Sequence, residues 1–221
     1  MAWTPRPRSS CRRRCQLTGT LGAFIRIRDI IPSRRALFDI GVAGPFAGFV
    51  VAIPALVLGL ALSRPGPRAP DLDAIVLGHP LVHQAVQYLL WGTLPDGYVL
   101  HLHPAARAAW FGLLATALNL FPMAQLDGGH VTYALVGPRA RWVTLAGAVA
   151  LVGLTLLSTA WMAWALLMAV VLAVSGVAHP PTLDDGPGLD RRRRLLALAA
   201  AVVFALCFTP LPVDVIEAAA P

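Results

Sequence analysis

The sequence predicts an all-α membrane protein of about five transmembrane helices, with a short surface β-strand or hairpin near the N-terminus. Hydrophobic residues make up 57% of the 221 residues and charged residues only 13%, whereas a soluble domain carries about 25% charged residues. The mean hydropathy is +0.67. The apolar residues also gather in runs long enough to cross a hydrocarbon core about 30 Å thick. These observations favour a helical bundle in a lipid bilayer.

Five apolar segments are the expected spans, and backbone groups in lipid must be satisfied within a segment, so each should be a helix. They are residues 38–62, 106–124, 140–157, 159–177 and 194–211. The stretch 83–92 is too short and too polar to cross, and it predicts an interfacial or loop helix. Residues 63–73, which are rich in proline, and residues 179–194 are expected to be connecting loops.

A strand is expected before the first span. Residues 23–30, AFIRIRDI, alternate Ile25 and Ile27 with Arg26 and Arg28, which is the period of a strand with one wet face. Pro32 ends the pattern. This strand should lie at the cytoplasmic surface of the membrane. It is either part of a hairpin that lies along the membrane surface or an edge strand whose unpaired backbone groups have a function.

All 18 basic residues are arginine, and their positions predict topology. By the positive-inside rule, fifteen arginines fall on the side of the N-terminus and three, Arg64, Arg68 and Arg107, on the other. We therefore expect a cytoplasmic N-terminus. The membrane that we expect is the bacterial plasma membrane. The arginines form no patch interleaved with aromatic residues, so nucleic-acid binding is not expected.

Composition divides the chain into four parts. Residues 1–20 are a basic arm, expected to be disordered or not native, and no apolar stretch follows that would make it a signal peptide. Residues 21–36 hold the surface strand, 37–211 the transmembrane domain and 212–221 a tail. Three cysteines, Cys11, Cys15 and Cys207, fit neither a disulfide framework nor a zinc-ligand spacing.

Asp127 is the strongest candidate for a functional residue. A carboxylate at membrane depth costs about 2.5 to 3.5 kcal/mol, so it usually has a partner or a role. Pro122 removes a helical hydrogen bond, and Gly128 with Gly129 should let the backbone unwind and approach a neighbouring group closely. Broken backbone at that depth is tolerated where it lines a cavity. The residues alone leave three uses open: a metal ligand, an ion-coupling carboxylate of a transporter, or a structural hydrogen-bonding group.

Asn119, Pro122 and the Leu126-Asp127-Gly128 core resemble the Asn-x-x-Pro…Leu-Asp-Gly motif of the site-2 protease family of intramembrane zinc metalloproteases. The resemblance continues, in the family's order, in GAFIRIRDIIPSRRALFDIGVAGPFAG, in LHPAARAAWFGLLATALNLFP and in HPPTLDD, and it covers residues from about 17 to 211.

The resemblance implies a hydrolase with a zinc cofactor that cleaves peptide bonds in or near the membrane, as in regulated intramembrane proteolysis. Residues 37–211 would be the metalloprotease-like domain, and Asp127 would be a zinc ligand. Asn119, Pro122 and Gly128 would shape the substrate cleft. A membrane-embedded peptide or protein would add a strand at Ile25, Arg26 and Ile27.

One departure from the family is serious. The other two zinc ligands and the general base of the family come from a His-Glu-x-x-His helix. This sequence has no such motif, and its single glutamate, Glu217, follows the last apolar segment. We therefore expect the chain to lack an N-terminal span or two and to be inactive alone. The alternative is a non-catalytic membrane scaffold or client-binding protein; a transporter is disfavoured because no second buried ionisable residue is evident.

The histidines are not expected to bind metal. His79 and His83 have the i, i+4 spacing of a ligand pair but no glutamate between them, so they should be a solvated loop pair, and His101 and His103 should share the same outer region. His130 either faces the Asp127 site or simply begins a helix, and His179 should be solvated. Gly44 and Gly48, four residues apart, predict close helix packing.

Overall fold

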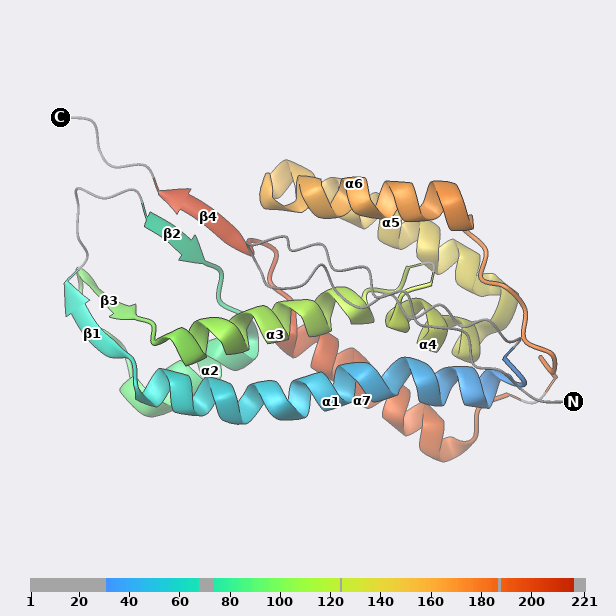
Figure 1. The fold of residues 1–221 in the computed structure, drawn as a ribbon, viewed down its shortest axis with the longest axis horizontal. Helices are drawn as coiled ribbons and strands as arrows, with labels where there is room; N and C mark the ends of the chain where they lie inside the picture. Colours follow the sequence, from blue (N-terminus) through green and yellow to red (C-terminus); the bar gives the residue numbers. More distant parts are fainter. Residues whose placement is uncertain (1–30, 68–73, 124, 187, 217–221) are drawn as a thin grey trace, which may run out of the picture. The chain divides into compact units, whose positions relative to one another are not determined.

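The computed structural model describes residues 31–67, 74–123, 125–186 and 188–216 (Figure 1). The strand predicted at Ile25, Arg26 and Ile27 and the basic arm lie outside these residues. The described part is mostly helical, as predicted. Its helices are α1 (Arg34–Ala61), α2 (Leu81–Trp91), α3 (Pro104–Leu120), α4 (Asp127–Val136), α5 (Ala140–Leu157), α6 (Ala160–Ser175) and α7 (Arg191–Cys207), with the 3-10 turn η1 (Gly137–Arg139) between α4 and α5.

A helix covers most of each predicted apolar segment, although α3 and α7 end four residues before the predicted segments do, and the helix expected near residues 83–92 is α2. Two stretches are long and apolar enough to cross a membrane. These are Arg34–Ala61, with mean hydropathy 2.1, and Asp127–Leu157, with mean hydropathy 1.7. Ala160–Val174 is a shorter apolar helix. The prediction of a mostly helical fold is thus confirmed, and two helical stretches, rather than five, are candidates for membrane spans within the described residues.

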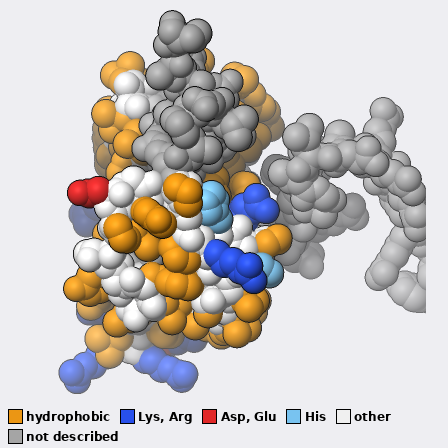
Figure 2. Space-filling model, turned by 90° about the vertical axis from the view of Figure 1, so that its left-hand side faces the viewer, with side chains coloured by type: hydrophobic (Ala, Val, Ile, Leu, Met, Phe, Trp, Pro, Cys, Tyr) orange, Lys and Arg blue, Asp and Glu red, His pale blue; other side chains and the backbone are white. Residues whose placement is uncertain are grey.

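Many large apolar side chains of α5 and α6 point away from the protein. Leu156 is 85% exposed and Val174 is 82% exposed. A soluble protein rarely leaves large contiguous apolar patches uncovered, whereas a lipid-facing surface consists of such side chains. Figure 2 shows the end of the described chain that carries α2, where hydrophobic side chains also cover much of the face. This surface agrees with the membrane localisation expected from composition.

The structure also contains two short antiparallel strand pairs that the sequence did not predict. β1 (Arg64–Pro67) pairs with β3 (Tyr98–His101), and β2 (Ala74–Leu77) pairs with β4 (Val213–Ile216). The expectation of a plain connector was wrong for β1. Its sequence, Arg-Pro-Gly-Pro, has low β propensity, so pairing with a distant segment determines its conformation.

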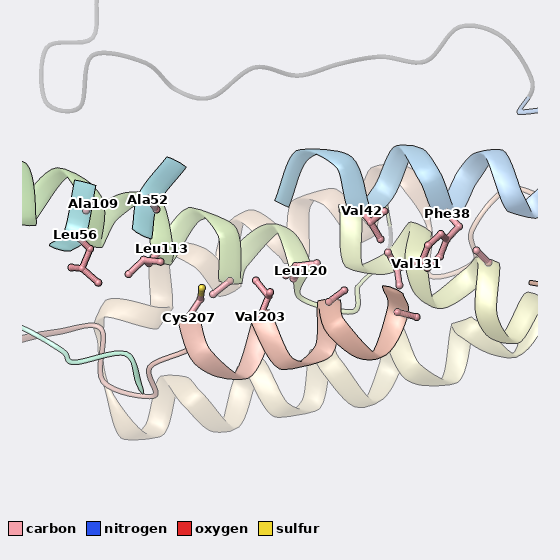
Figure 3. Close-up of a cluster of buried hydrophobic side chains, with 14 of the residues drawn as sticks. Phe38, Val42, Ala52, Leu56, Ala109, Leu113, Leu120, Val131, Val203 and Cys207 are labelled. Atoms are coloured by element: carbon pink, nitrogen blue, oxygen red, sulfur yellow. The ribbon is translucent and has the colours of Figure 1, made fainter. Parts of the chain in front are cut away.

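The core lies where α1 crosses α3, α4 and α7. Figure 3 shows the side chains that meet there, which come from four helices: Phe38, Val42, Ala52, Leu56, Ala109, Leu113, Leu120, Val131, Val203 and Cys207. Small residues on α1 let the neighbours approach closely. A Cβ atom added at Gly48 would lie 3.2 Å from the Oγ1 atom of Thr116, and one at Gly44 would lie 3.4 Å from the Oδ2 atom of Asp127. The close packing predicted for this pair of glycines is thus confirmed at Gly48, whereas the distance at Gly44 is that of an ordinary contact.

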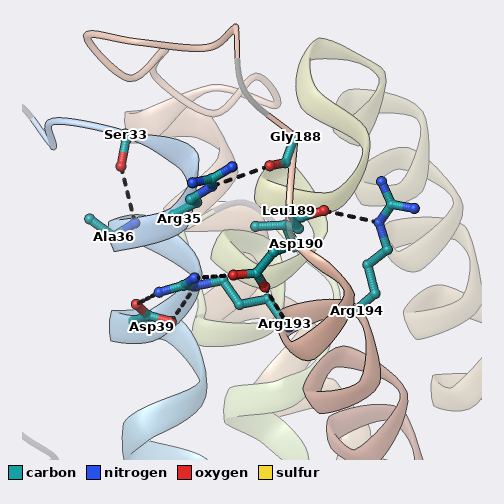
Figure 4. A network of polar contacts seen from close by, with 9 residues as sticks. All are labelled: Ser33, Arg35, Ala36, Asp39, Gly188, Leu189, Asp190, Arg193 and Arg194. Atoms are coloured by element: carbon teal, nitrogen blue, oxygen red, sulfur yellow. Dashed lines mark hydrogen bonds and ion pairs between the residues drawn. The ribbon is translucent and has the colours of Figure 1, made fainter.

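Arginine side chains form hydrogen bonds and ion pairs between helix ends on the side where α1 begins. Arg193 donates two hydrogen bonds to the Asp39 carboxylate, at 2.9 and 2.6 Å, and a third to Asp190 at 2.7 Å (Figure 4). Asp190 also caps α7 by accepting from the backbone N–H of Arg193. Arg34 donates to the Ala134 carbonyl oxygen at 3.0 Å. These contacts connect the start of α1 to α7 and α4.

Candidate metal-ligand site at the start of helix α4

The segment between α3 and α4 forms the candidate site. Helix α3 ends at Leu120 because Pro122 cannot continue it. The chain then turns, with the Met123 N–H donating to the Phe121 carbonyl at 2.7 Å and the Leu126 N–H donating to the Met123 carbonyl at 3.1 Å. Helix α4 begins immediately afterwards with Asp127. The break predicted in the helix is confirmed.

The role predicted for the two glycines is confirmed in one part and wrong in the other, because the backbone approaches its neighbours closely at Gly128 but does not unwind. Gly128 and Gly129 are not unwound; they lie buried in the first turn of α4. Gly128 is needed for space, because a Cβ atom there would overlap the carbonyl oxygens of Leu120 and Phe121. The first turn of α4 therefore packs directly on the end of α3, which fixes where Asp127 starts.

The Asp127 carboxylate is half-buried and faces Gly44 of α1. Within the described part of the chain it makes no hydrogen bond and no ion pair with any side chain or backbone group. The positive end of the α4 dipole favours an anion at this position but does not replace a partner. A half-buried carboxylate with no partner among the described residues argues against the structural hydrogen-bonding role and fits either of the other two uses, a metal ligand or an ion-coupling carboxylate.

Asn119 and Pro122 lie on the same stretch. Asn119 is exposed on the last turn of α3, and its side-chain amide makes no hydrogen bond with the described residues. Pro122 borders an open groove of about 450 Å³ with an apolar lining. The other lining residues come from the turn, α5 and α7: Phe121, Val143, Ala146, Gly147, Ala150, Leu154, Phe204 and Phe208. Asn119, Pro122, Asp127 and Gly128 thus lie within or next to the turn between α3 and α4, and of these four only Pro122 lines the groove.

An imidazole pair lies one helical turn beyond Asp127. The Nδ1 atom of His130 is 2.7 Å from the Nε2 atom of His179. The Tyr133 ring stacks on the His179 ring, with the two ring centroids 4.6 Å apart. The Tyr133 hydroxyl donates to the Asp185 carboxylate at 2.8 Å. The expectation that His179 is solvated was wrong, because residues 179–185 fold back on α4. Burial lowers the pKa of His179 below its usual value.

Sequence reasoning missed this pair. A signal was present, because His130 and Tyr133 are three residues apart and share a helix face. What no local pattern could supply is the return of a segment 49 residues further along the chain.

The second imidazole pair lies at the far end of the bundle. The Nδ1 atoms of His79 and His83 are 3.3 Å apart. His83 is completely buried, whereas His79 is exposed, so the expectation of a solvated pair was wrong for His83. Burial, together with the charge of a protonated His79, lowers the pKa of His83 to about 4. His101 lies in β3, and His103 caps α3 by accepting the Ala105 N–H at 3.2 Å.

The described residues do not make up a zinc site by themselves. Nowhere among them do three histidine, cysteine, aspartate or glutamate side chains gather as metal ligands would. A protein zinc site needs three or four such ligands, and Asp127 alone would be one. The sequence contains no His-Glu-x-x-His motif to supply the rest.

A family model described as peptidase family M50 matches residues 15–160, which is more than half of the chain. The chain belongs to peptidase family M50. The resemblance to site-2 proteases read from the Asn119 to Gly128 motif is therefore confirmed. The match to the M50 model also includes Ile25, Arg26 and Ile27.

The names of similar proteins agree with this family. The M50 chain is 31% identical over 140 residues to the probable zinc metalloprotease EGY2, chloroplastic, of Arabidopsis thaliana, covering 63% of this chain and 25% of that protein. It is 28% identical over 198 residues to the probable zinc metalloprotease EGY1, chloroplastic, of Oryza sativa subsp. japonica, covering 87% of this chain and 34% of that protein. The chain thus spans a quarter to a third of these relatives' length.

Another relative has a different kind of name. The M50 chain is 32% identical over 126 residues to the DDT domain-containing protein PTM of Arabidopsis thaliana, covering 55% of this chain and 7% of that protein. No solved structure gives a significant match. The metalloprotease names agree with the expected zinc and hydrolase class, whereas their chloroplast location does not support the predicted bacterial plasma membrane.

Proposed function

We propose that this M50 chain is part of a zinc-dependent membrane metallopeptidase and that Asp127 is one of its zinc ligands. The observation that carries the proposal is the half-buried Asp127 carboxylate, which has no partner within the described residues. The zinc metalloprotease names of the relatives support it. Hydrolysis needs two further ligands and a general base that this sequence does not contain, so the chain alone is inactive.

The substrate is a membrane-embedded peptide or protein, cleaved in or near the bilayer as in regulated intramembrane proteolysis. Asn119, Pro122 and Gly128 shape the cleft, and the apolar groove beside Pro122 accepts apolar substrate side chains. Ile25, Arg26 and Ile27 receive the substrate as an added strand. The exposed position of Asn119, with its amide unpaired within the described residues, supports a role in holding a peptide.

In the membrane, the five apolar segments span the bilayer with residues 1–20 and the strand region 21–36 on the cytoplasmic side. The arginine distribution supports this orientation. Residues 37–211 then form the membrane-embedded metalloprotease-like domain, and residues 212–221 form the tail. The exposed apolar side chains of α5 and α6 supply the lipid contacts.

The test restores the missing ligands. The chain is co-expressed with an N-terminal segment of an M50 relative that carries a His-Glu-x-x-His helix, and the purified complex is analysed for zinc and for cleavage of a membrane-spanning reporter peptide. We expect roughly one zinc per complex, and Asp127→Asn should remove most of that zinc and the cleavage.

Asp96→Asn is the matched control, because Asp96 is an exposed carboxylate in the loop between α2 and β3. This variant should keep its zinc and its activity. Equal zinc in the wild type and in Asp127→Asn would contradict the proposed ligand.

A second candidate function is a non-catalytic membrane scaffold or client-binding protein on the same fold. The absence of the His-Glu-x-x-His motif from the sequence favours it. So does the similarity to a relative whose name is not that of a protease. In the co-expression experiment this candidate predicts that the reporter peptide is bound but never cleaved, and that zinc content does not depend on Asp127.

A further inference from the structure

The imidazole pair beside Asp127 has a defined polarity. The Nδ1 atom of His179 is 2.6 Å from the Pro180 carbonyl oxygen, which can only accept a hydrogen bond. Nδ1 of His179 therefore carries the hydrogen, and in the neutral ring Nε2 is the acceptor. The Nδ1 atom of His130, 2.7 Å from that nitrogen, must then be the donor. Burial keeps the pKa of His179 below its usual value, which favours this neutral form.

The pair is part of a larger attachment of residues 179–185 to α4. The Tyr133 ring stacks on His179 with an interplanar angle of 27°, and the Tyr133 hydroxyl donates to Asp185. The Thr182 hydroxyl donates to the same carboxylate, and this contact is the main reason why the pKa of Asp185 lies below its usual value. An imidazole, a phenol ring and a carboxylate thus hold the segment on the first two turns of α4.

The same segment is attached to the start of α1. The Leu183 N–H donates to the Ile31 carbonyl at 3.0 Å, and the Asp184 N–H donates to the Pro32 carbonyl at 3.1 Å. Residues 179–185 therefore bridge the residues that precede α1 and the turn that begins α4.

This turn carries Asp127. His130 follows Asp127 by three residues, so the two side chains share a helix face. A Cβ atom at Gly41 of α1 would lie 3.0 Å from both the Asp127 carbonyl oxygen and the Cβ atom of His130. The turn thus rests directly on α1, and a shift of His130 must move Asp127 relative to Gly44.

We propose that His130 and His179 are positioning residues that latch residues 179–185 onto α4 and so fix the place of the Asp127 carboxylate. Neither imidazole is required to touch the metal. The link to zinc rests on the proposed function of Asp127, whereas the latch itself is a property of this chain. Groups that orient a metal ligand typically change metal affinity by about 10- to 100-fold when removed.

Two substitutions at His179 separate its two contacts. His179→Phe keeps a ring to stack on Tyr133 but removes the nitrogen that accepts from His130. His179→Gln loses the stack but offers a carbonyl oxygen as the acceptor. His101→Gln, in β3 at the other end of the bundle, is the matched control.

The experiment uses the full 221-residue chain in detergent micelles, labelled with ¹⁵N-histidine. Imidazole nitrogen shifts report which ring nitrogen of His130 carries the hydrogen, and hydrogen exchange reports the His130 amide, which donates to the Leu126 carbonyl at 2.9 Å. We expect the Nδ1–H form in the wild type, in His179→Gln and in His101→Gln. His179→Phe should show a mixture of forms and roughly five- to tenfold faster exchange of that amide.

An Nε2–H form of His130 in the wild-type chain overturns the latch without any variant. Unchanged tautomer and unchanged exchange in His179→Phe overturn it as well. The complex with the His-Glu-x-x-His segment then tests the link to zinc. We expect His179→Phe to weaken zinc binding about tenfold or more and His179→Gln to restore it.

Zinc binding unchanged by His179→Phe, with Asp127→Asn still losing zinc, overturns the positioning role and leaves the proposed function standing. Zinc binding that does not depend on Asp127 removes the proposed function, and with it the link between latch and metal.

Discussion

The two imidazole pairs of this chain differ in how they form and in what they can do. His79 and His83 lie four residues apart, and their Nδ1 atoms meet at 3.3 Å. His130 and His179 lie 49 residues apart, and their contact continues to the Pro180 carbonyl. The first pair has the spacing of a metal-ligand motif, and the second has none. Yet only the second lies beside a carboxylate that has no partner within the described residues.

The difference teaches that spacing selects a geometry but does not assign a role. The Nε2 atom of His83 is buried without a hydrogen-bond partner in the described structure. A buried polar atom of this kind costs about 1 to 3 kcal/mol. In the second pair, by contrast, the His130 to His179 contact is directed by a backbone carbonyl. We therefore regard the first pair as a structural feature and the second as part of the site.

Near each imidazole pair, a glycine lies against a backbone carbonyl oxygen. We call the end of the bundle with His130 and His179 the site end and the end with His79 and His83 the far end. Replacing these two glycines should give the largest losses of stability. A Cβ atom at Gly128 would overlap the carbonyl oxygens of Leu120 and Phe121, and one at Gly78 would overlap that of Leu211. We expect Gly128→Ala and Gly78→Ala each to lower the free energy of unfolding by about 2 to 3 kcal/mol, measured by denaturant titration in mixed micelles.

Only Gly128→Ala should also lower zinc binding in the complex with the His-Glu-x-x-His segment, because only that glycine positions Asp127. Gly153→Ala is the control: nothing lies within 4 Å of its Cβ position, and alanine in a helix should gain up to about 1 kcal/mol. Loss of zinc in Gly78→Ala would mean that the two ends are coupled, and the comparison between them would fail.

Most of the fold follows from local sequence, and what does not is non-local. The apolar runs around α1, α3, α5, α6 and α7 specify helices because each run alone must satisfy its backbone in lipid. The strands β1 and β2 were missed because their partners β3 and β4 lie far along the chain. A four-residue segment with two prolines carries no strand signal of its own.

The site divides in the same way. Asp127 and the break at Pro122 were predicted because a lone carboxylate and a proline in an apolar run are local signals. The burial of His83 and of His179 was mispredicted, because solvation of a side chain depends on which distant segment covers it. Sequence located the candidate ligand but could not show what holds it.

The second prediction concerns pH, with an intermediate effect. The pKa of His83 is about 4 in the folded chain, against an ordinary value of 6.5. Between these values the unfolded chain binds a proton that the folded chain does not, so stability is highest above pH 6.5 and falls as the pH drops toward 4. The loss due to His83 should be about 2 kcal/mol at a pH of about 5.

His83→Leu should remove this part of the pH dependence. It should cost little at neutral pH, because Nε2 of His83 has no partner to lose in the described structure and Nδ1 loses only its 3.3 Å contact with the exposed His79. The check is the free energy of unfolding at pH values of about 7.5 and 5, with His101→Gln as the control. If His83→Leu and the wild type lose the same stability on acidification, then the His130–His179 pair, rather than His83, causes most of the loss of stability at low pH.

The smallest effect is expected from the ion pairs that join α7 to α1 at the site end. Arg193 binds Asp39 through two hydrogen bonds, but the Asp39 side chain is 51% exposed and the Arg193 side chain 25%. Water and salt screen such pairs, so Asp39→Asn should shift the unfolding midpoint little, and added salt should remove the remaining shift. Tyr133→Phe removes the hydrogen bond to Asp185 at the same end of the bundle, and its shift of the unfolding midpoint is compared with that of Asp39→Asn. If Asp39→Asn destabilised the chain as much as Gly128→Ala, then surface charges rather than close packing would hold the site end together, and the latch of residues 179–185 would be secondary to them.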